Sequence, residues 1–267
     1  MSALPTLAFL LIILSAIVQA VFLFRKERAA DPVSHWLAGL AALLLAAVIA
    51  TRSVEIGFPA LTGTFESLVF YALVLCALTL AYRLQRGLPF LPLVQFGATL
   101  AALALLAVSS SPLAPRETLA PIPALRSGWL VAHVALSFVG EAFFVASFVA
   151  SVAYLSVHDV EKRRDYDRIS YTSVAVGYPV FTVGALIFGA IWAERAWGSW
   201  WSWDPKETWA LVTWLVYTLY LHLRLIRRGE RADAGSLPAV VAVAGFLCTV
   251  FTFFGVNFLL TGLHSYG

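Results

Sequence analysis

Charged residues are scarce in this chain of 267 residues. Asp, Glu, Lys and Arg together make up 12% of it, whereas a soluble globular domain contains about 25%. A chain so poor in charge cannot cover a folded core with a polar surface, which excludes a soluble globular enzyme. Hydrophobic residues make up 61% of the chain and the mean hydropathy is +0.85, which excludes an intrinsically disordered protein.

Cysteine is almost absent. Cys76 and Cys248 each lie inside an apolar run, and the sequence contains no CxxC motif. We therefore expect neither a disulfide framework nor a thiol redox site, and interpret both cysteines as small buried hydrophobic residues. The net charge is +3, and basic residues in a membrane protein mostly record its orientation, so no nucleic-acid partner is expected.

Long, continuous apolar runs are what the sequence has in abundance. Their continuity argues against a transmembrane β-barrel, whose strands alternate apolar and polar residues. At about 20 residues a span, the length allows about eight spans. The sequence predicts an all-α, polytopic helical membrane protein, embedded in a lipid bilayer as a single domain over residues 1–267. The expected spans are 4–24, 36–50, 65–82, 90–108, 129–157, 173–192, 208–226 and 237–260.

The first apolar run has a second interpretation. Val18-Gln19-Ala20 resembles the cleavage site of a signal peptide. However, no basic residue precedes the run, and the run is longer than a usual signal core, which favours a retained first span.

Basic residues divide unevenly between the two sets of loops. Segments 25–28, 83–86, 162–168 and 224–231 hold 13 of the 18 Lys and Arg residues. Because cytoplasmic loops are enriched in these residues, we expect this set at the cytoplasm, or the stroma of a plastid. Both termini then lie on the outer, periplasmic or lumenal side. The proline-rich segment 109–127 is expected there as an ordered loop or a short re-entrant piece.

Residues 197–209, WGSWWSWDPKETW, form the most informative segment. They contain five of the nine tryptophans, whereas an interfacial aromatic belt supplies about one or two at a span end. The cluster favours a flat platform for a large planar ligand with a polar edge, in an outer loop over 193–209. Asp204, Pro205 and Glu207 also predict a helix start with a capping-box-like arrangement, so a purely structural role for Asp204 stays open.

This segment resembles the tryptophan-rich "WWD" signature of the heme-handling proteins of cytochrome c maturation. Four further segments resemble the CcsA/ResC branch of that family: LTGTFES (61–67), WLVAHV (129–134), YLHLR (220–224) and FGVNFLLTGLHSYG (254–267). The resemblance covers the chain from about Arg52 onward.

The resemblance implies the heme-binding half of the System II cytochrome c synthase, with a CcsB/ResB-type membrane partner. Such a protein is expected in the bacterial cytoplasmic membrane, or in the thylakoid membrane of a plastid. It would carry heme b from an inner membrane site to the outer tryptophan loop. There the vinyl groups would meet the cysteines of the CxxCH motif of apocytochrome c. The heme-binding residues implied are Trp197, Trp200, Trp201, Trp203, Asp204, Trp209 and Glu66.

No residue is expected as a dedicated nucleophile. The first five of those residues would act as a platform that positions the vinyl groups, since a cofactor carries its own reactivity. Thioether synthesis by the complex is what the resemblance implies. Whether this chain is itself the enzyme is left open.

The histidines separate by position. His133 lies about five residues into the fifth span, and His264 follows the eighth. The resemblance implies that both are axial ligands of an outer heme iron. From the residues alone, a packed core histidine and a solvated tail residue are the alternatives. His222 follows Glu207 by 15 residues, about 22 Å of helix, and resembles the family's transmembrane ligand for a separate inner heme iron.

The remaining polar residues are less specific. His35 and His158 are expected as loop or interfacial residues at cytoplasmic span ends. Glu141 is interpreted either as a polar contact between helices or as a partner of a histidine. Three basic residues are either ordinary loop charges or partners of the heme propionates. They are Arg126, Arg195 and Lys206.

Three alternatives remain open. A heme-delivery subunit of the System I type shares the tryptophan signature, but is expected to have fewer spans and to lack the 262–266 ending. A heme exporter would bind heme without attaching it. A quinone-binding or purely structural subunit would show no heme absorption after purification.

Overall fold

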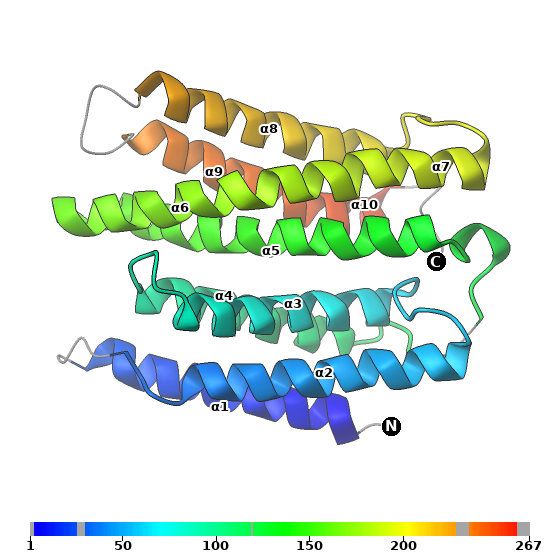
Figure 1. Cartoon of the computed structure of the whole chain (residues 1–267), viewed down its shortest axis with the longest axis horizontal. Coiled ribbons are helices and arrows are strands. Elements are labelled where there is room, and N and C mark those ends of the chain that lie inside the picture. The colour runs from blue at the N-terminus through cyan, green and yellow to red at the C-terminus, as the bar shows by residue number, and fades with distance from the viewer. Residues whose placement is uncertain (1–2, 26–29, 119, 228–234, 261–267) are drawn as a thin grey trace. The chain divides into compact units, whose positions relative to one another are not determined.

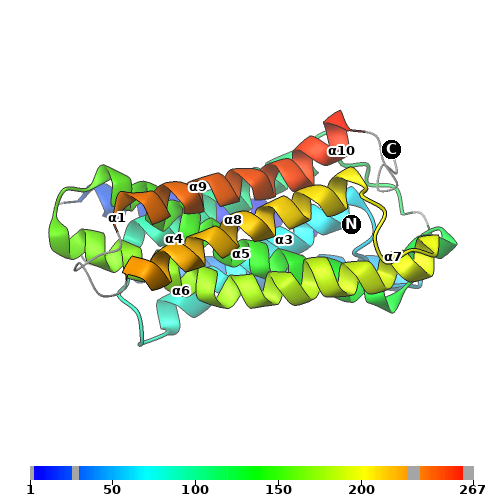
Figure 2. The ribbon, with the colours of Figure 1, turned by 90° about the horizontal axis from the view of Figure 1, so that it is seen from above.

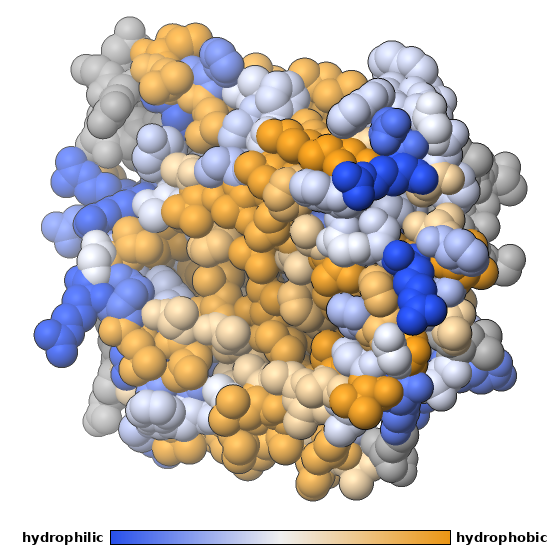
Figure 3. Space-filling view, turned by 45° about the vertical axis from the view of Figure 1, so that its right-hand side comes forward, coloured by the Kyte–Doolittle hydropathy of each residue, from blue (hydrophilic) through white to orange (hydrophobic). Residues whose placement is uncertain are grey.

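The computed structural model describes residues 3–25, 30–118, 120–227 and 235–260. In these parts of the chain, eight helical segments are long and apolar enough to cross a membrane, which confirms the predicted all-helical membrane protein. Hydrophobic residues cover the middle of the helices on the face drawn in Figure 3, and hydrophilic residues gather towards the helix ends.

Within the described ranges, the spans are built from ten α-helices and two π-helical segments. Five spans are single helices: α1 (Ala3–Phe24), α2 (Ser34–Ile56), α3 (Thr64–Leu84), α4 (Pro92–Ser109) and α5 (Gly128–Ser156). The sixth combines α6 (Val160–Phe181), η2 (Thr182–Phe188) and α7 (Gly189–Trp197). The last two are α8 (Pro205–Arg227), and α9 (Ser236–Val250) with η3 (Phe251–Gly255) and α10 (Val256–Leu259). A short 3-10 turn, η1 (Pro123–Leu125), lies in the proline-rich segment before α5.

Two of the predicted boundaries are wrong in an informative way. The sixth helix begins at Val160, well before the expected residue 173, because the Asp159 carboxylate accepts hydrogen bonds from the Glu161 and Lys162 amides and caps it. Its first turns are charged, so an apolar run does not reveal them. The second helix continues to Ile56 and includes Arg52, which hydropathy alone had assigned to a loop.

The chain divides into two compact units, Met1–Phe138 and Val139–Gly267, with the boundary inside α5. In the first unit, α1 packs against α2 and α4, while α3 packs against α2 and α4 (Figures 1 and 2). Gln19 ties α1 to α4 because its side-chain amide donates to the Thr99 hydroxyl, 2.9 Å away. The start of α5 joins this unit through Phe138, whose ring stacks on that of Tyr71.

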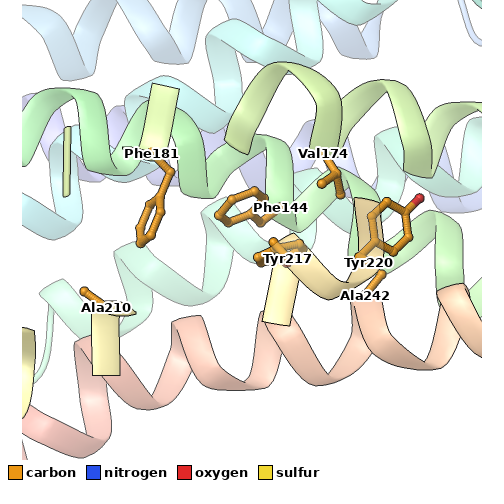
Figure 4. Packing of buried hydrophobic residues seen from close by; sticks show 7 residues of the cluster. All are labelled: Phe144, Val174, Phe181, Ala210, Tyr217, Tyr220 and Ala242. Carbon is orange, nitrogen blue, oxygen red and sulfur yellow. The ribbon is translucent and has the colours of Figure 1, made fainter. Parts of the chain in front are cut away.

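In the second unit, α8 packs against α9 and α6. Figure 4 shows the buried hydrophobic cluster between these helices and α5, with the Phe144 and Tyr217 rings stacked at 3.8 Å between centroids. Small residues let α5 and α6 approach closely: a Cβ added at Gly177 would lie 2.9 Å from the Gly140 carbonyl oxygen. The cluster consists of Phe144, Val174, Phe181, Ala210, Tyr217, Tyr220 and Ala242.

Both π-helical segments lie in this second unit. η2 immediately precedes α7, which leads into the tryptophan segment, and η3 precedes α10. A π-turn shifts the register of all the residues that follow it, and such turns occur frequently at functional sites.

Candidate functional site

The tryptophan segment is a short loop fixed at both ends by helix caps. Gly198 adopts the left-handed conformation (φ 74°), and its amide donates to the Glu194 carbonyl at 2.8 Å, which ends α7. At the other end, Asp204 Oδ1 accepts the Lys206 amide at 2.9 Å, directly before α8 begins at Pro205. The predicted helix start is therefore confirmed.

Glu207 does not complete the predicted capping box, because its side chain contacts a different residue from the one that a capping box requires. Its carboxylate accepts the backbone amide of Ser202 at 2.8 Å and the Ser202 hydroxyl at 3.1 Å, rather than the amide of the cap residue Asp204. It thereby holds the loop itself. Between these contacts, Trp203 has a φ of 59°, which is uncommon for a residue with a side chain.

The loop sorts its tryptophans into two kinds. Trp200 and Trp203 are 61% and 69% exposed. Trp197 and Trp201 are half-buried, and each packs edge-on against another indole, with centroids 5.8 Å apart: Trp197 against Trp192, and Trp201 against Trp203. Trp192, which is buried in α7, packs against Trp197 and so supports the start of the loop. It lies just before the segment 193–209 that the sequence predicts as the outer loop.

The half-buried indoles carry two hydrogen-bond donors of interest. Nε1 of Trp197 and Nε1 of Trp201 have no acceptor among the residues that the structure describes. Trp209, in the first turn of α8, is half-buried against the ring of Phe251 at 4.3 Å between centroids. Exposed aromatic faces suit a planar apolar ligand, and indole N–H groups suit its acidic edge. The residues present therefore fit a heme.

The predicted histidine ligands fall in different parts of the chain. His133 is half-buried in the second turn of α5, and its carbonyl accepts the Ser137 hydroxyl at 2.6 Å. His222 is exposed near the end of α8, with Nδ1 2.8 Å from the Thr218 carbonyl oxygen. Because a carbonyl only accepts, Nδ1 carries the proton and Nε2 keeps a lone pair for a metal. His264 lies outside the described residues.

The other two histidines also differ from each other. His158 is exposed between α5 and α6. His35 is buried in the first turn of α2, with its ring 4.9 Å from that of Trp36, so it lies at a span end, as expected, but not in a loop. The helix begins at this point because Asp31 accepts the Ser34 amide at 2.6 Å.

Glu66 lies in the first turn of α3 and is buried in an ion pair with Arg52. Arg52 Nε donates to Glu66 Oε1 at 2.6 Å, and both Nη atoms of the guanidinium donate to the Arg116 carbonyl at 3.2 Å. The guanidinium carbon also lies 4.8 Å from the centre of the Phe65 ring. Sequence reasoning missed this contact. A second helix that continues past its apolar run contains Arg52, and a buried arginine needs an acidic partner such as Glu66.

Lys206 is not a loop charge. It is half-buried in the first turn of α8, and Nζ donates to Asn257 Oδ1 of α10 at 3.0 Å. Glu141 is buried on α5 and close enough for its charge to act on Lys206. Glu141 Oε2 has no hydrogen-bond partner among the described residues, so the two roles expected of Glu141, a contact between helices or a partner of a histidine, both stay predictions. Arg126 and Arg195 are exposed.

Known proteins match the chain over most of its length. The family described as "Cytochrome C assembly protein" matches residues 63–264. The "Cytochrome c biogenesis protein CcsA" of Chlamydomonas reinhardtii is 37% identical and aligns with 86% of this chain and 67% of its own. Proteins of the same name from Guillardia theta and Prochlorococcus marinus (strain MIT 9303) are 32% and 36% identical, and 89% of each aligns.

A solved structure shares the fold. The "Cytochrome c Heme Lyase CcmF" superposes with a TM-score of 0.70 at 17% identity, over 94% of this chain. This chain spans 46% of the length of that protein. The tryptophan-rich signature, the eight candidate spans and these relatives agree, and the chain belongs to the cytochrome c assembly protein family, as a multi-pass membrane protein of the CcsA kind that serves cytochrome c biogenesis.

Proposed function

We propose that this protein binds heme and presents it on the outer side of the membrane for covalent attachment to the CxxCH motif of apocytochrome c. The tryptophan loop carries the proposal. The loop exposes two indoles, Trp200 and Trp203, and also contains the indole N–H groups of Trp197 and Trp201, which lack acceptors among the described residues. The relatives are named for cytochrome c biogenesis, which supports heme as the planar ligand.

Heme is the substrate in this proposal, and the loop positions it. The exposed indole faces cover the apolar porphyrin, and indole N–H groups donate to the propionates. Asp204 and Trp209 complete the platform where the loop meets α8. Each attachment adds a cysteine S–H across one vinyl group, with sulfur bonding to the carbon next to the ring and hydrogen to the terminal carbon. The platform contributes orientation and excludes water.

The family resemblance supports His133 and His264 as the two axial ligands of the outer heme iron. It supports His222 as the ligand of an inner heme, and its hydrogen bond to the Thr218 carbonyl leaves Nε2 free to coordinate iron. Fifteen residues of α8 separate His222 from Glu207 and span about 22 Å, so His222 belongs to a different site from the loop.

The orientation follows from the distribution of basic residues. The loops rich in Lys and Arg face the cytoplasm or stroma, and both termini and the tryptophan loop face outward. The two units then act as one heme-handling domain of a System II synthase, in the bacterial cytoplasmic or thylakoid membrane, with a CcsB/ResB-type partner. The family resemblance also supports Glu66 as a residue of the heme site, and its ion pair with Arg52 fixes the start of α3.

The proposal is tested with the chain purified together with its partner. Replacing His133 or His264 with glycine removes an imidazole but leaves the platform, so added imidazole is expected to restore the low-spin heme spectrum and part of the attachment activity. Alanine at Trp200, Trp201 and Trp203 removes the aromatic surface, which a small ligand cannot replace. That variant is expected to lose heme without rescue by imidazole.

His222→Ala provides the matched comparison. It is expected to reduce heme loading without changing the axial-ligand spectrum of heme held at the outer site. Equal rescue of the histidine and tryptophan variants would contradict the separation of ligand from platform. Heme binding without attachment to apocytochrome c, in the presence of the partner, would instead favour a heme exporter or a delivery subunit.

A further inference from the structure

Two aromatic residues and two threonines join the sixth span to α8 in a reciprocal pattern. The Trp214 indole donates to the Thr182 hydroxyl at 3.0 Å, and that hydroxyl donates to the Tyr178 carbonyl at 2.7 Å. In return, the Tyr178 hydroxyl lies 2.7 Å from the Thr218 hydroxyl, which donates to the Trp214 carbonyl at 2.8 Å. Each span therefore supplies one aromatic side chain and one threonine. We call these four residues the clamp.

The direction of the bond between Tyr178 and Thr218 follows from the number of hydrogen atoms. A threonine hydroxyl has one hydrogen, and Thr218 uses it on the Trp214 carbonyl. The Thr218 oxygen therefore accepts, and the Tyr178 hydroxyl is the donor. The Tyr178 and Trp214 rings also stack, with 5.6 Å between their centroids. The clamp thus depends on both hydroxyl groups as well as on ring packing.

His222 continues the row of α8 residues that forms one half of the clamp. Trp214, Thr218 and His222 follow one another at intervals of four, so they are neighbours along one side of the helix. Trp214 and Thr218 are half-buried, whereas His222 is exposed. The Thr218 carbonyl accepts His222 Nδ1 at 2.8 Å. The imidazole is therefore attached to the turn of α8 that receives the Tyr178 hydroxyl.

The clamp lies where the sixth span departs from a regular α-helix. Pro179, inside α6, has no amide hydrogen to donate to the Ala175 carbonyl, and the π-helical segment η2 begins three residues later, at Thr182. A regular ladder of backbone hydrogen bonds does not fix the span at this level. The contacts of the clamp therefore have a large part in setting how α8 is rotated against α6.

A heme ligand must present its lone pair to the iron within a narrow range of directions. A rotation of α8 about its axis would turn His222 Nε2 away from an iron atom held by the rest of the site. We propose that Tyr178 and Thr218 are positioning residues for the inner heme. Their hydrogen bond fixes the rotation of α8 against α6, and with it the direction in which His222 Nε2 points. This inference rests on the inner heme site proposed above.

The test measures inner-heme ligation in the chain purified with its partner and loaded with heme b. The part of the low-spin spectrum that His222→Ala removes identifies the inner heme. Tyr178→Phe removes the donor and Thr218→Val removes the acceptor, while the Thr218 carbonyl remains for His222. Each variant is expected to lower the ratio of low-spin to high-spin inner heme about fivefold, as loss of one neutral hydrogen bond predicts. The outer-heme spectrum is expected to stay unchanged, and added imidazole to restore the low-spin inner heme.

A double variant isolates the bond between the two residues. Tyr178→Phe combined with Thr218→Val is expected to show the same ratio as either single variant, because both changes break one contact. Thr218→Ser keeps the hydroxyl and is expected to retain the wild-type ratio. Because Thr218→Ser and Thr218→Val differ in the acceptor, they test the contact even if Tyr178→Phe does not fold.

Two matched controls make the same changes in the first unit. Thr79→Val removes a hydroxyl that bonds the Leu75 carbonyl of its own helix, so it measures the loss of that kind of bond alone. Tyr82→Phe removes a phenol that bonds the Pro89 carbonyl and the Leu91 amide. Both controls are expected to leave the ratio of low-spin to high-spin inner heme unchanged.

Three outcomes would overturn the inference. Wild-type inner-heme ligation in both Tyr178→Phe and Thr218→Val, or effects that add in the double variant, would do so while the proposed function stands. An equal loss of inner and outer heme in both single variants would show general damage rather than positioning. A heme spectrum unchanged by His222→Ala would remove the inner site of the proposed function and this inference with it.

Discussion

At the scale of single residues, the buried pair of Arg52 and Glu66 shows how the second and third spans are tied together. Each side chain would be costly alone inside an apolar bundle, and removing one partner of a buried pair typically costs about 3–5 kcal/mol. Gly63 makes room for the pair, because a Cβ at that position would collide with Glu66 Oε2.

Gly63→Ala is therefore expected to destabilise the protein. The added methyl group must push Glu66 away from Arg52, which we expect to cost about 1–3 kcal/mol, as for other overpacked sites. Thermal unfolding in detergent measures the effect as a lower midpoint. Gly128→Ala is the control, since a Cβ there meets no atom within 4 Å, and it is expected to leave the midpoint unchanged. Equal midpoints for the two variants would contradict the role given to Gly63.

Residue-level features were predictable where the determining residues are neighbours in sequence. The start of α8 was predicted because Asp204 and Pro205 are both local signals. The ion pair of Arg52 with Glu66 and the contact of Lys206 with Asn257 were not, because each joins residues from different helices. Sequence spacing does not encode which helix faces which.

At the scale of elements, the number of spans was predictable and several boundaries were not. Hydropathy detects apolar surface, so it found all eight spans. It does not detect the first turns of α6, because they are polar. It also does not detect the two π-helical segments, which lie inside apolar runs like those of the neighbouring helices. Close packing of α5 on α6 depends on the meeting of Gly140 with Gly177, and a single sequence does not show which glycines of two helices face each other.

The crossing of α5 and α6 gives the second prediction. Gly177→Ala places a methyl group 2.7 Å from Phe143 Cβ and 2.9 Å from the Gly140 carbonyl oxygen, where no flexible side-chain end can move aside. The helices must separate, so we expect a loss of about 1–3 kcal/mol, seen as lower thermal stability and greater protease sensitivity of the second unit. Val176→Leu adds similar volume at an exposed neighbouring position and is expected to be neutral. A stable Gly177→Ala variant would show that the helices are not packed this closely.

At the scale of the whole molecule, the distribution of charge predicts the orientation in the membrane. Thirteen of 18 basic residues lie in one set of loops and their helix ends, including the first turns of α6. The assignment of the tryptophan loop to the outer side depends on this asymmetry, because the loop lies on the opposite side of the sixth and seventh spans from those charges. The proposed site is meaningful only if the loop reaches the compartment where apocytochrome c is matured.

Orientation is tested by labelling single cysteines in intact cells. The background is the chain with Cys76 and Cys248 replaced by alanine, which removes one buried and one half-buried thiol. Ser202→Cys places a thiol at an exposed position of the tryptophan loop, and Glu161→Cys places one at the exposed start of α6. An impermeant thiol reagent is expected to label the first from outside. The second is expected to react only after the membrane is disrupted, because the loops rich in Lys and Arg face the cytoplasm.

The reverse pattern would place the tryptophan loop in the cytoplasm and would contradict heme presentation at the outer side. Labelling of both thiols in intact cells would show instead that the reagent crosses the membrane, which a cytosolic protein with a known exposed thiol detects in the same cells.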